Sequence, residues 1–325
     1  MAITSSTIQN LVGLTEKVLG DTVNVLLKDN NTLLTSGLAA TSPVVDAVAG
    51  GGSRVASLPF INPYATDTVN ISNDDINDDG DVINTTGGTF MALRSDLNIG
   101  LGFTDLQAAV TKWNGKGETP AMLADYWNTV YTKMGVSAIV GALKVNSGLT
   151  YTAGAGVPLY NASMLAGATA GTHADEFDIL IVNPVDYANM RIDNKIAFIP
   201  GSKTESRFDE WGGFKLVKSK AFPAGTAVMA RTGALAFGVG LPVPFIETEY
   251  ERLANKANGG GADILHSRRS VVVQPQGFSW KGGVAPTVLK NGSTAPALET
   301  AANWELIVSD IEQIGFRKIV LTPSA

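Results

Sequence analysis

The chain has 325 residues with a net charge of −6, of which 45% are hydrophobic and 17% charged, and it contains no cysteine. These values indicate an ordered globular protein with a large core, and they exclude a disulfide framework and a thiolate metal site. The acidic balance argues against a surface basic enough to wrap nucleic acid tightly.

Residues 1–52 are predicted to form an N-terminal arm with modest helical signals. The first residues have no basic region followed by an apolar core, so no signal peptide is expected. Ser42 is suited to cap a helix, Pro43 to its first position and Gly50 to its end. The glycines at 50–52 then mark a hinge or a boundary.

Residues 53–101 are predicted to form a long β-hairpin with an acidic tip. They hold seven Asp and two Arg, which places −5 of the total charge in this segment. Arms of about 20 residues would reach roughly 60 Å at about 3.3 Å per residue. A two-stranded ribbon of that length is marginal by itself, so it must lie on the rest of its own chain or on a neighbour.

The tip, residues 74–86, reads DDINDDGDVINTT and is similar to the first half of an EF-hand calcium loop. Asp75, Asn77 and Asp79 have the ligand spacing, but Thr86 stands where the loop needs a bidentate Glu. The flanks are strand-like rather than helical. The three residues are therefore the only candidates for a metal site, and a solvated acidic tip is the favoured interpretation. No cofactor is expected.

Two helices are predicted after the hairpin. Residues 104–107, TDLQ, match a capping box that opens a short helix. The stronger helix is predicted over 120–144, with Thr119 as its cap and apolar side chains at a spacing of four residues. Gly135 is a candidate break in it.

The rest of the chain favours strands. Residues 145–175 are rich in Gly, Ala and Thr and are expected to be loop-like. A short helix capped by Asn183 and Pro184 is expected over 185–190, residues 299–308 are expected to be a short helix, and residues 314–322 are expected to be an edge strand. Further strands are predicted over 177–182, 213–222, 226–231 and 234–240.

A charged strand pair is predicted over 244–275. Glu247, Glu249 and Glu251 alternate with other residues on one strand face, and Arg252, Arg268 and Arg269 are the nearby cations. The row is interpreted as a solvated face or as an ion-pair seam within or between chains. Paired acids for glycoside hydrolysis are a weaker reading.

No set of catalytic residues is recognisable in the sequence. The Walker A, dinucleotide-binding and nucleophile-elbow motifs are missing. The two histidines, His173 and His266, are interpreted as surface and structural residues. The chain is therefore not expected to be an enzyme.

The order of these parts resembles the major capsid protein of tailed bacteriophages with the Hong Kong 97 fold, an α+β fold. Residues 57–64 resemble the entry to that family's extended loop, and residues 123–144, LADYWNTVYTKMGVSAIVGALK, resemble its spine helix. Residues 247–280, ETEYERLANKANGGGADILHSRRSVVVQPQGFSW, resemble that family's late segment of acidic and basic residues. Residues 179–190 and 303–321 complete a likeness that covers nearly the whole chain.

The resemblance implies an architecture and a function. It implies an N-terminal arm at 1–52, an extended loop at 53–101, a peripheral domain at 102–149 and 241–297, and an axial domain at 150–240 and 298–325. It implies an icosahedral shell, assembled in the bacterial host cytoplasm, that holds double-stranded DNA in the virion. The implied partners are copies of the chain in hexamers and pentamers, a portal protein, scaffolding or decoration proteins, and packaged DNA without sequence-specific contact. No membrane partner is implied.

Contacts between copies are expected on the loop and on the charged strands. The predicted residues are Phe60, Asp74, Asp75, Asp78, Asp79, Asp81, Arg94, Glu247, Glu249, Arg252, Arg268 and Arg269. Residues 53–101 contain no Lys, so the isopeptide crosslink of some family members is not expected from this loop. The short arm favours a separate scaffold, or none, over proteolytic maturation. The alternatives are an encapsulin-like nanocompartment shell and a calcium-dependent soluble binding module.

Overall fold

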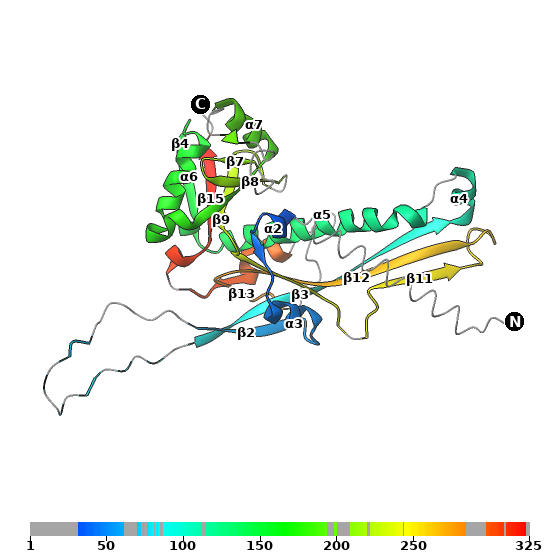
Figure 1. The fold of residues 1–325 in the computed structure, drawn as a ribbon, viewed down its shortest axis with the longest axis horizontal. Coiled ribbons are helices and arrows are strands. Elements are labelled where there is room, and N and C mark those ends of the chain that lie inside the picture. The colour runs from blue at the N-terminus through cyan, green and yellow to red at the C-terminus, as the bar shows by residue number, and fades with distance from the viewer. Residues whose placement is uncertain are drawn as a thin grey trace.

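The computed structural model describes residues 32–61, 70–72, 74, 77, 79–80, 82, 84, 87–111, 115–193, 198–199, 209–219, 222–242, 244–283, 297–308 and 310–322. These residues form a mixed α+β fold with two principal sheets, as expected (Figure 1). The longer sheet runs beneath one long helix, and the smaller sheet lies beyond the C-terminal end of that helix.

The longer sheet is built around two long antiparallel strands, β3 (Gly87–Thr104) and β12 (Ala262–Pro275). Their register runs from Thr104 opposite Ala262 to Arg94 opposite Val272. β12 also pairs with the predicted partner strand β11, and the pairing order is β1-β10-β12-β3-β2. The other strands are β1 (Ala39–Ala40), β2 (Val55–Ile61), β10 (Leu235–Gly240) and β11 (Thr248–Leu253). β10 thus belongs to this sheet, although it falls within the segment 150–240 that was expected to be axial.

The long helix α5 (Gly115–Leu143) covers one face of this sheet. Its 29 residues span about 43 Å at 1.5 Å per residue. Trp127 and Tyr131 are buried beneath it, and the Trp127 indole donates a hydrogen bond to Ser267 Oγ at 3.1 Å. The helix continues through Gly135, so this candidate break does not occur. The side chains of Leu33 and Leu235 occupy the space that a side chain at Gly135 would need.

The smaller sheet has the order β4-β15-β9-β5-β8-β7-β6. Helices α6 (Leu159–Ala168) and α7 (Pro184–Asp193) pack on one of its faces. The strands are β4 (Thr150–Ala155), β5 (Phe177–Val182), β6 (Phe198–Ile199), β7 (Glu210–Trp211), β8 (Phe214–Lys218), β9 (Thr226–Arg231) and β15 (Phe316–Thr322).

Two expectations about this region are wrong. Residues 145–175 are not loop-like, because they hold β4, α6 and two 3₁₀ turns, Ser147–Leu149 and Gly171–Glu176. Their small side chains serve packing: Ala162 and Ala166 of α6 are fully buried against the sheet. The strand at the end of the chain is not an edge strand either, because β15 lies between β4 and β9.

Short elements complete the fold. Helix α2 (Thr32–Thr35) packs on α5, and α3 (Pro43–Gly50) packs on β10. Helix α4 (Asp105–Thr111) follows β3 directly. The expected helix over 299–308 is replaced by two 3₁₀ turns (Ala297–Glu299 and Ala301–Asn303) and β14 (Trp304–Leu306), which pairs with β13 (Phe278–Trp280). A further 3₁₀ turn, Ile311–Gln313, precedes β15.

Three of the predicted helix caps are confirmed, but Thr119 is not a cap: α5 begins at Gly115, so Thr119 and Pro120 lie inside its first two turns. The Ser42 hydroxyl accepts a hydrogen bond from Val44 N at 3.4 Å, and Thr104 Oγ1 accepts one from Gln107 N at 3.2 Å. Asn183 Oδ1 accepts one from Val185 N at 2.9 Å at the start of α7. Each cap satisfies a backbone donor that the first helical turn leaves without a partner. Among the described helices, none is long and apolar enough to cross a membrane.

Candidate inter-subunit surfaces

The base of the predicted hairpin is a paired ribbon, while its predicted metal site is only partly described. β2 and β3 pair from Val55 opposite Leu93 to Ile61 opposite Gly87. At the tip, Asp74 and Asp79 are exposed, and Asp75, Asp78 and Asp81 lie outside the described residues. Asp75, Asn77 and Asp79 are therefore not described as one site. No group of three metal-ligating side chains exists among the residues that are described.

Phe60 supports the ribbon from within the chain. It lies directly opposite Gly88, and a Cβ atom at Gly88 would come within 2.7 Å of the Phe60 ring. The ring centroids of Phe60 and Phe90 are 6.3 Å apart. The ring therefore covers a glycine that offers no packing surface of its own. Its predicted contact with another copy remains a prediction.

Arg94 belongs to a charged cluster where the ribbon joins the longer sheet. The Arg94 guanidinium is buried, pairs with Asp96 at 3.0 Å and donates to Gly51 O. Asp96 also pairs with Arg54 at 3.2 Å and accepts a hydrogen bond from Ser270 Oγ at 2.6 Å. Burial alone would raise the pKa of Asp96. The bonds from Ser270 and Arg94 and the two arginine charges outweigh burial, so this pKa is lowered.

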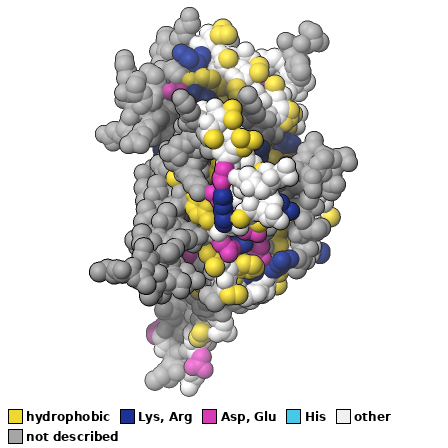
Figure 2. Space-filling model, turned by 90° about the vertical axis from the view of Figure 1, so that its right-hand side faces the viewer, with side chains coloured by type: hydrophobic (Ala, Val, Ile, Leu, Met, Phe, Trp, Pro, Cys, Tyr) yellow, Lys and Arg dark blue, Asp and Glu magenta, His cyan; other side chains and the backbone are white. Residues whose placement is uncertain are grey.

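The predicted ion-pair seam on β11 and β12 forms within one chain. Glu249 pairs with Arg268 at 2.9 Å, and Glu251 pairs with His266 at 3.0 Å. Figure 2 views the molecule from its α4 end and shows acidic and basic side chains next to one another there. The carboxylates of this seam therefore have partners before any second copy approaches.

Glu247 and Arg269 form a separate and more buried pair. The Arg269 side chain is 4% exposed and pairs with Glu247, which is 32% exposed. Both charges act on the phenol of Tyr131 beneath α5, although burial is the main reason that the pKa of Tyr131 is raised. This pair fastens the start of β11 under the long helix. Arg269 lies inside the chain, and Glu247 reaches it from the partly exposed start of the strand.

Arg252 does not pair with the glutamate row, so that expectation is wrong. Its guanidinium contacts Asp105 at 3.0 and 2.5 Å and Asp263 at 2.9 Å. The hydrogen bonds to Asp105 and Asp263 raise the pKa of Arg252. Asp105 is the first residue of α4, and its backbone N–H donates to Gly261 O at 3.2 Å. The three side chains thus hold α4 against the turn between β11 and β12.

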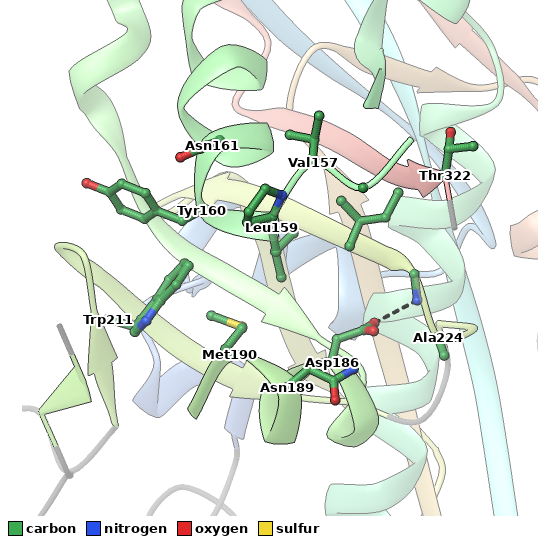
Figure 3. A pocket seen from close by; sticks show the side chains of 14 residues that line it. Val157, Leu159, Tyr160, Asn161, Asp186, Asn189, Met190, Trp211, Ala224 and Thr322 are labelled. Carbon is green, nitrogen blue, oxygen red and sulfur yellow. Dashed lines mark hydrogen bonds between the residues drawn. The ribbon is translucent and has the colours of Figure 1, made fainter. Parts of the chain in front are cut away.

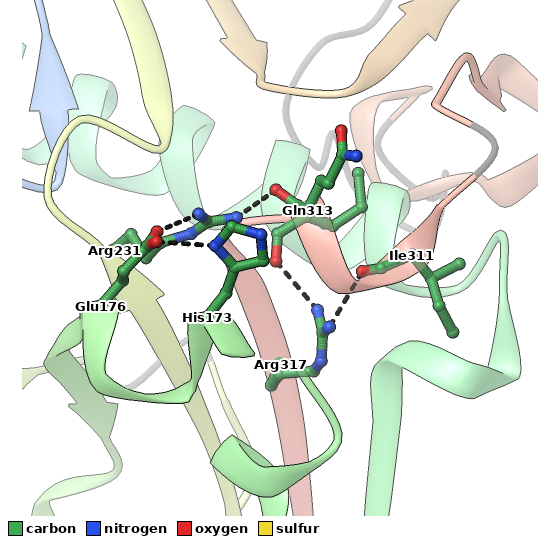
Figure 4. A network of polar contacts seen from close by, with 7 residues as sticks. His173, Glu176, Arg231, Ile311, Gln313 and Arg317 are labelled. Atoms are coloured by element: carbon green, nitrogen blue, oxygen red, sulfur yellow. Dashed lines mark hydrogen bonds and ion pairs between the residues drawn. The ribbon is translucent and has the colours of Figure 1, made fainter. Parts of the chain in front are cut away.

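A second polar cluster, which the sequence analysis did not identify, fixes the segment that leads into β15 (Figure 4). Glu176 is bonded by His173 at 2.6 Å and by Arg231, and these bonds lower the pKa of Glu176. Arg231 also donates to Gln313 O. Arg317 is fully buried and donates to Ile311 O and Ile314 O at 2.9 Å each. Glu176 and Arg231 are far apart in sequence, so no local pattern could show their pairing.

The smaller sheet carries a cavity of about 660 Å³ between α6 and α7 (Figure 3). Apolar side chains form most of its wall, among them Leu159, Met190 and Leu321. Asp186 lies in the wall, and one of its oxygens accepts a hydrogen bond from Gly225 N at 2.8 Å. Burial raises the pKa of Asp186, and the bond from Gly225 opposes that rise only in part. Nothing in the sequence pattern distinguished this acid from a surface residue of α7.

The fold was compared with solved structures. A chain of Microbacterium phage Oxtober96 is 13% identical and matches with a TM-score of 0.53, covering 88% of this chain and 91% of that chain. The capsid of Ralstonia phage GP4 is 10% identical, with a TM-score of 0.52 and coverage of 74% and 84%. The satellite phage P4 procapsid with its size determination protein is 8% identical, with a TM-score of 0.52 and coverage of 94% and 91%.

These matches confirm that the chain has the fold of solved phage capsid structures, as the resemblance implied. No protein-family model matches the sequence, and no curated protein does. The likeness therefore lies in the order and arrangement of the elements, at sequence identities of 8–13%.

Proposed function

We propose that the chain is the major capsid protein of a tailed bacteriophage, a structural protein that assembles into the icosahedral shell around double-stranded DNA. One observation carries the proposal: the fold is similar to that of solved phage structures, including a capsid and a procapsid, over 74–94% of this chain. A match of that extent is larger than a shared local motif. The function follows by analogy of fold, so it is open to a direct test.

The proposed roles of the parts follow from the two sheets. The longer sheet with α5 forms the peripheral domain, and the smaller sheet forms the axial domain. We place the boundary near Arg231, rather than at 240, because β9 belongs to the smaller sheet and β10 to the longer one. The extended loop that lies across an adjacent copy is the ribbon of β2 and the start of β3 with its tip, and it ends near Leu93 rather than at 101, because residues 94–101 pair with β12 inside the longer sheet. A ribbon of two strands needs such a support because isolated hairpins are marginally stable.

The proposed partners are other copies of the chain, as hexamers and pentamers, together with a portal protein and packaged DNA. The acidic balance of the chain supports confinement of DNA without tight phosphate contacts. In this proposal the shell is the location of the chain in the virion, and assembly takes place in the bacterial host.

Negative-stain electron microscopy of the expressed protein tests the function. Closed isometric particles are expected after gel filtration, and the particle fraction should contain this chain as its main component. A small species of uniform size that never forms particles would contradict the proposal. If particles form in a phage-infected cell but hold a protein cargo instead of DNA, the encapsulin-like alternative holds.

A further inference from the structure

The cavity between α6 and α7 holds a carboxyl group whose charge is not balanced locally. Asp186 is 7% exposed. Its only hydrogen bond among the described residues comes from Gly225 N, and no described basic side chain contributes to its raised pKa. A buried carboxylate is costly without a cation. The cavity therefore suits a ligand with an apolar body and a positively charged end.

The surface around the cavity indicates that the ligand belongs to a protein. Met164 and Leu165 on α6 are 43% and 50% exposed, one turn beyond the cavity residue Asn161. Val185 and Ile192 on α7 are 57% and 71% exposed, one turn to either side of the cavity residue Asn189. Residues three or four apart on a helix share one face. A small amine would fill the cavity and leave these four side chains in water, whereas a protein surface would cover them.

The opposite face of the same sheet presents a suitable group. Ile319 of β15 belongs to the cluster beneath α6 and α7, so its neighbour Lys318 faces the other way. Lys318 is partly exposed. Lys215 of β8 also faces that way, but it pairs with Asp178 at 3.7 Å. A lysine combines a long apolar stem with a charged end, as the cavity requires.

Rotational assembly would bring the two faces together. In a ring of identical copies, one face of each copy meets a different face of the next. We infer, on the basis of the capsid function proposed above, that the α6–α7 cavity of one copy receives Lys318 of the next copy within a capsomer. The ammonium group then lies on Asp186, and the stem packs between Leu159 and Met190.

Two single variants and their combination test the inference. Asp186→Asn keeps an oxygen for the Gly225 N–H and removes the buried charge, so the melting temperature of the unassembled subunit should not fall. The yield of particles should nevertheless fall at least tenfold, and Lys318→Gln should have the same effect. The double variant should be no worse than either single variant, because both remove one interaction. Asp175→Asn, an exposed acid of the same sheet unit, is the matched control and should assemble normally.

The outcomes separate this inference from the proposed function. If wild-type protein forms particles and Asp186→Asn forms them with equal yield, the inference is overturned and the shell function stands. If the wild type forms no particles, both the inference and the proposed shell function are overturned. A third outcome combines two results: wild type and Asp186→Asn give equal particle yields, and n-butylamine raises the melting temperature of the wild type but not of Asp186→Asn. The cavity would then be a site for a small amine, and the inference would be overturned. A double variant whose loss is the sum of the two single losses would also overturn it.

Discussion

Gly141 allows the segment 297–304 to cross α5 at very close range. A Cβ atom there would collide with the backbone oxygen of Leu298 and come within 2.6 Å of the Trp304 indole nitrogen. These two groups form a hydrogen bond of 2.8 Å, so they cannot separate freely.

Gly141→Ala should therefore lower the free energy of unfolding of the subunit by about 3 kcal/mol, at the upper end of the cost of overpacking. Urea unfolding of unassembled protein measures the change. Gly52→Ala is the control, because nothing lies within 4 Å of a Cβ atom at Gly52. Equal urea midpoints for the two variants would show that the crossing can relax.

Asp96 makes the base of the ribbon sensitive to acid. Its pKa is lower in the folded chain than in the unfolded one, so its stabilising contribution is complete above the unfolded value of about 3.9. That contribution is lost as the pH falls further, through the folded value. Asp96→Asn should cost about 1–3 kcal/mol at pH 7, because the Arg94 charge stays buried without its partner.

The difference between wild type and Asp96→Asn should stay constant down to about pH 4 and shrink below it. Urea titrations at several pH values measure this. Asp125→Asn on the exposed face of α5 should show no such profile. If the difference in free energy of unfolding between wild type and Asp96→Asn grew as the pH fell, this role for Asp96 would be refuted.

Individual partners were the least predictable feature at this scale. The sequence left open whether the acids of β11 form a solvated face or pair with the bases of β12, and the structure shows that they pair. The sequence did not indicate that Glu251 pairs with His266 rather than with an arginine. It also did not indicate that Arg252 reaches Asp105, because that contact depends on where α4 begins after a long strand. Pairing across a sheet depends on register, which single positions do not reveal.

Among the elements, α4 is held mainly by a polar clamp. Arg252 and Asp105 are about half exposed, with values of 51% and 49%. Exposed ion pairs contribute at most about 1 kcal/mol to global stability, yet they can hold a short helix in place.

Arg252→Gln should therefore speed amide hydrogen exchange in residues 105–111 and change the free energy of unfolding by less than about 1 kcal/mol. Hydrogen-exchange mass spectrometry measures the first effect. Lys256→Gln on the adjacent turn is the control. Unchanged exchange in α4 would mean that the backbone contact to Gly261 alone holds the helix.

Elements with a clear periodicity were predicted well. Helix α5, the ribbon strands and the β11–β12 pair follow from apolar spacing and alternation, although α5 begins at Gly115 rather than at the predicted residue 120. Helix α6 was missed because its Ala and Gly residues give no contrast between faces. The helix forms because those small side chains let it approach the sheet closely. The interior position of β15 was missed because it depends on β4 and β9, which lie far away in sequence.

For the whole molecule, the acidic tip of the ribbon has a proposed role in assembly. A charged tip discourages ribbons from pairing edge to edge before they reach a neighbour. Replacing Asp78 and Asp79 by Lys should slow or misdirect particle formation, as followed by light scattering and microscopy. Replacing the exposed Asp125 and Asp175 by Lys controls for the same change of charge away from the ribbon. An unchanged rate and yield of shells would rule out this role.

The shell should be held together without covalent bonds from the extended loop. Residues 53–101 contain no Lys, so this loop cannot supply the amine of an isopeptide bond. Purified particles boiled in detergent should therefore run on a denaturing gel as a single band near 33.9 kDa. A ladder of covalent multimers would contradict this expectation.

Both sheets join strands that are more than 150 residues apart in sequence: β3 pairs with β12, and β4 pairs with β15. Chains with such distant pairings fold slowly, because a long loop must close before the contacts form. Unpaired strand edges stay exposed meanwhile and can join those of other chains. Production of this protein should therefore depend on chaperone capacity and on slow, cool expression more than on the final stability of its subunit.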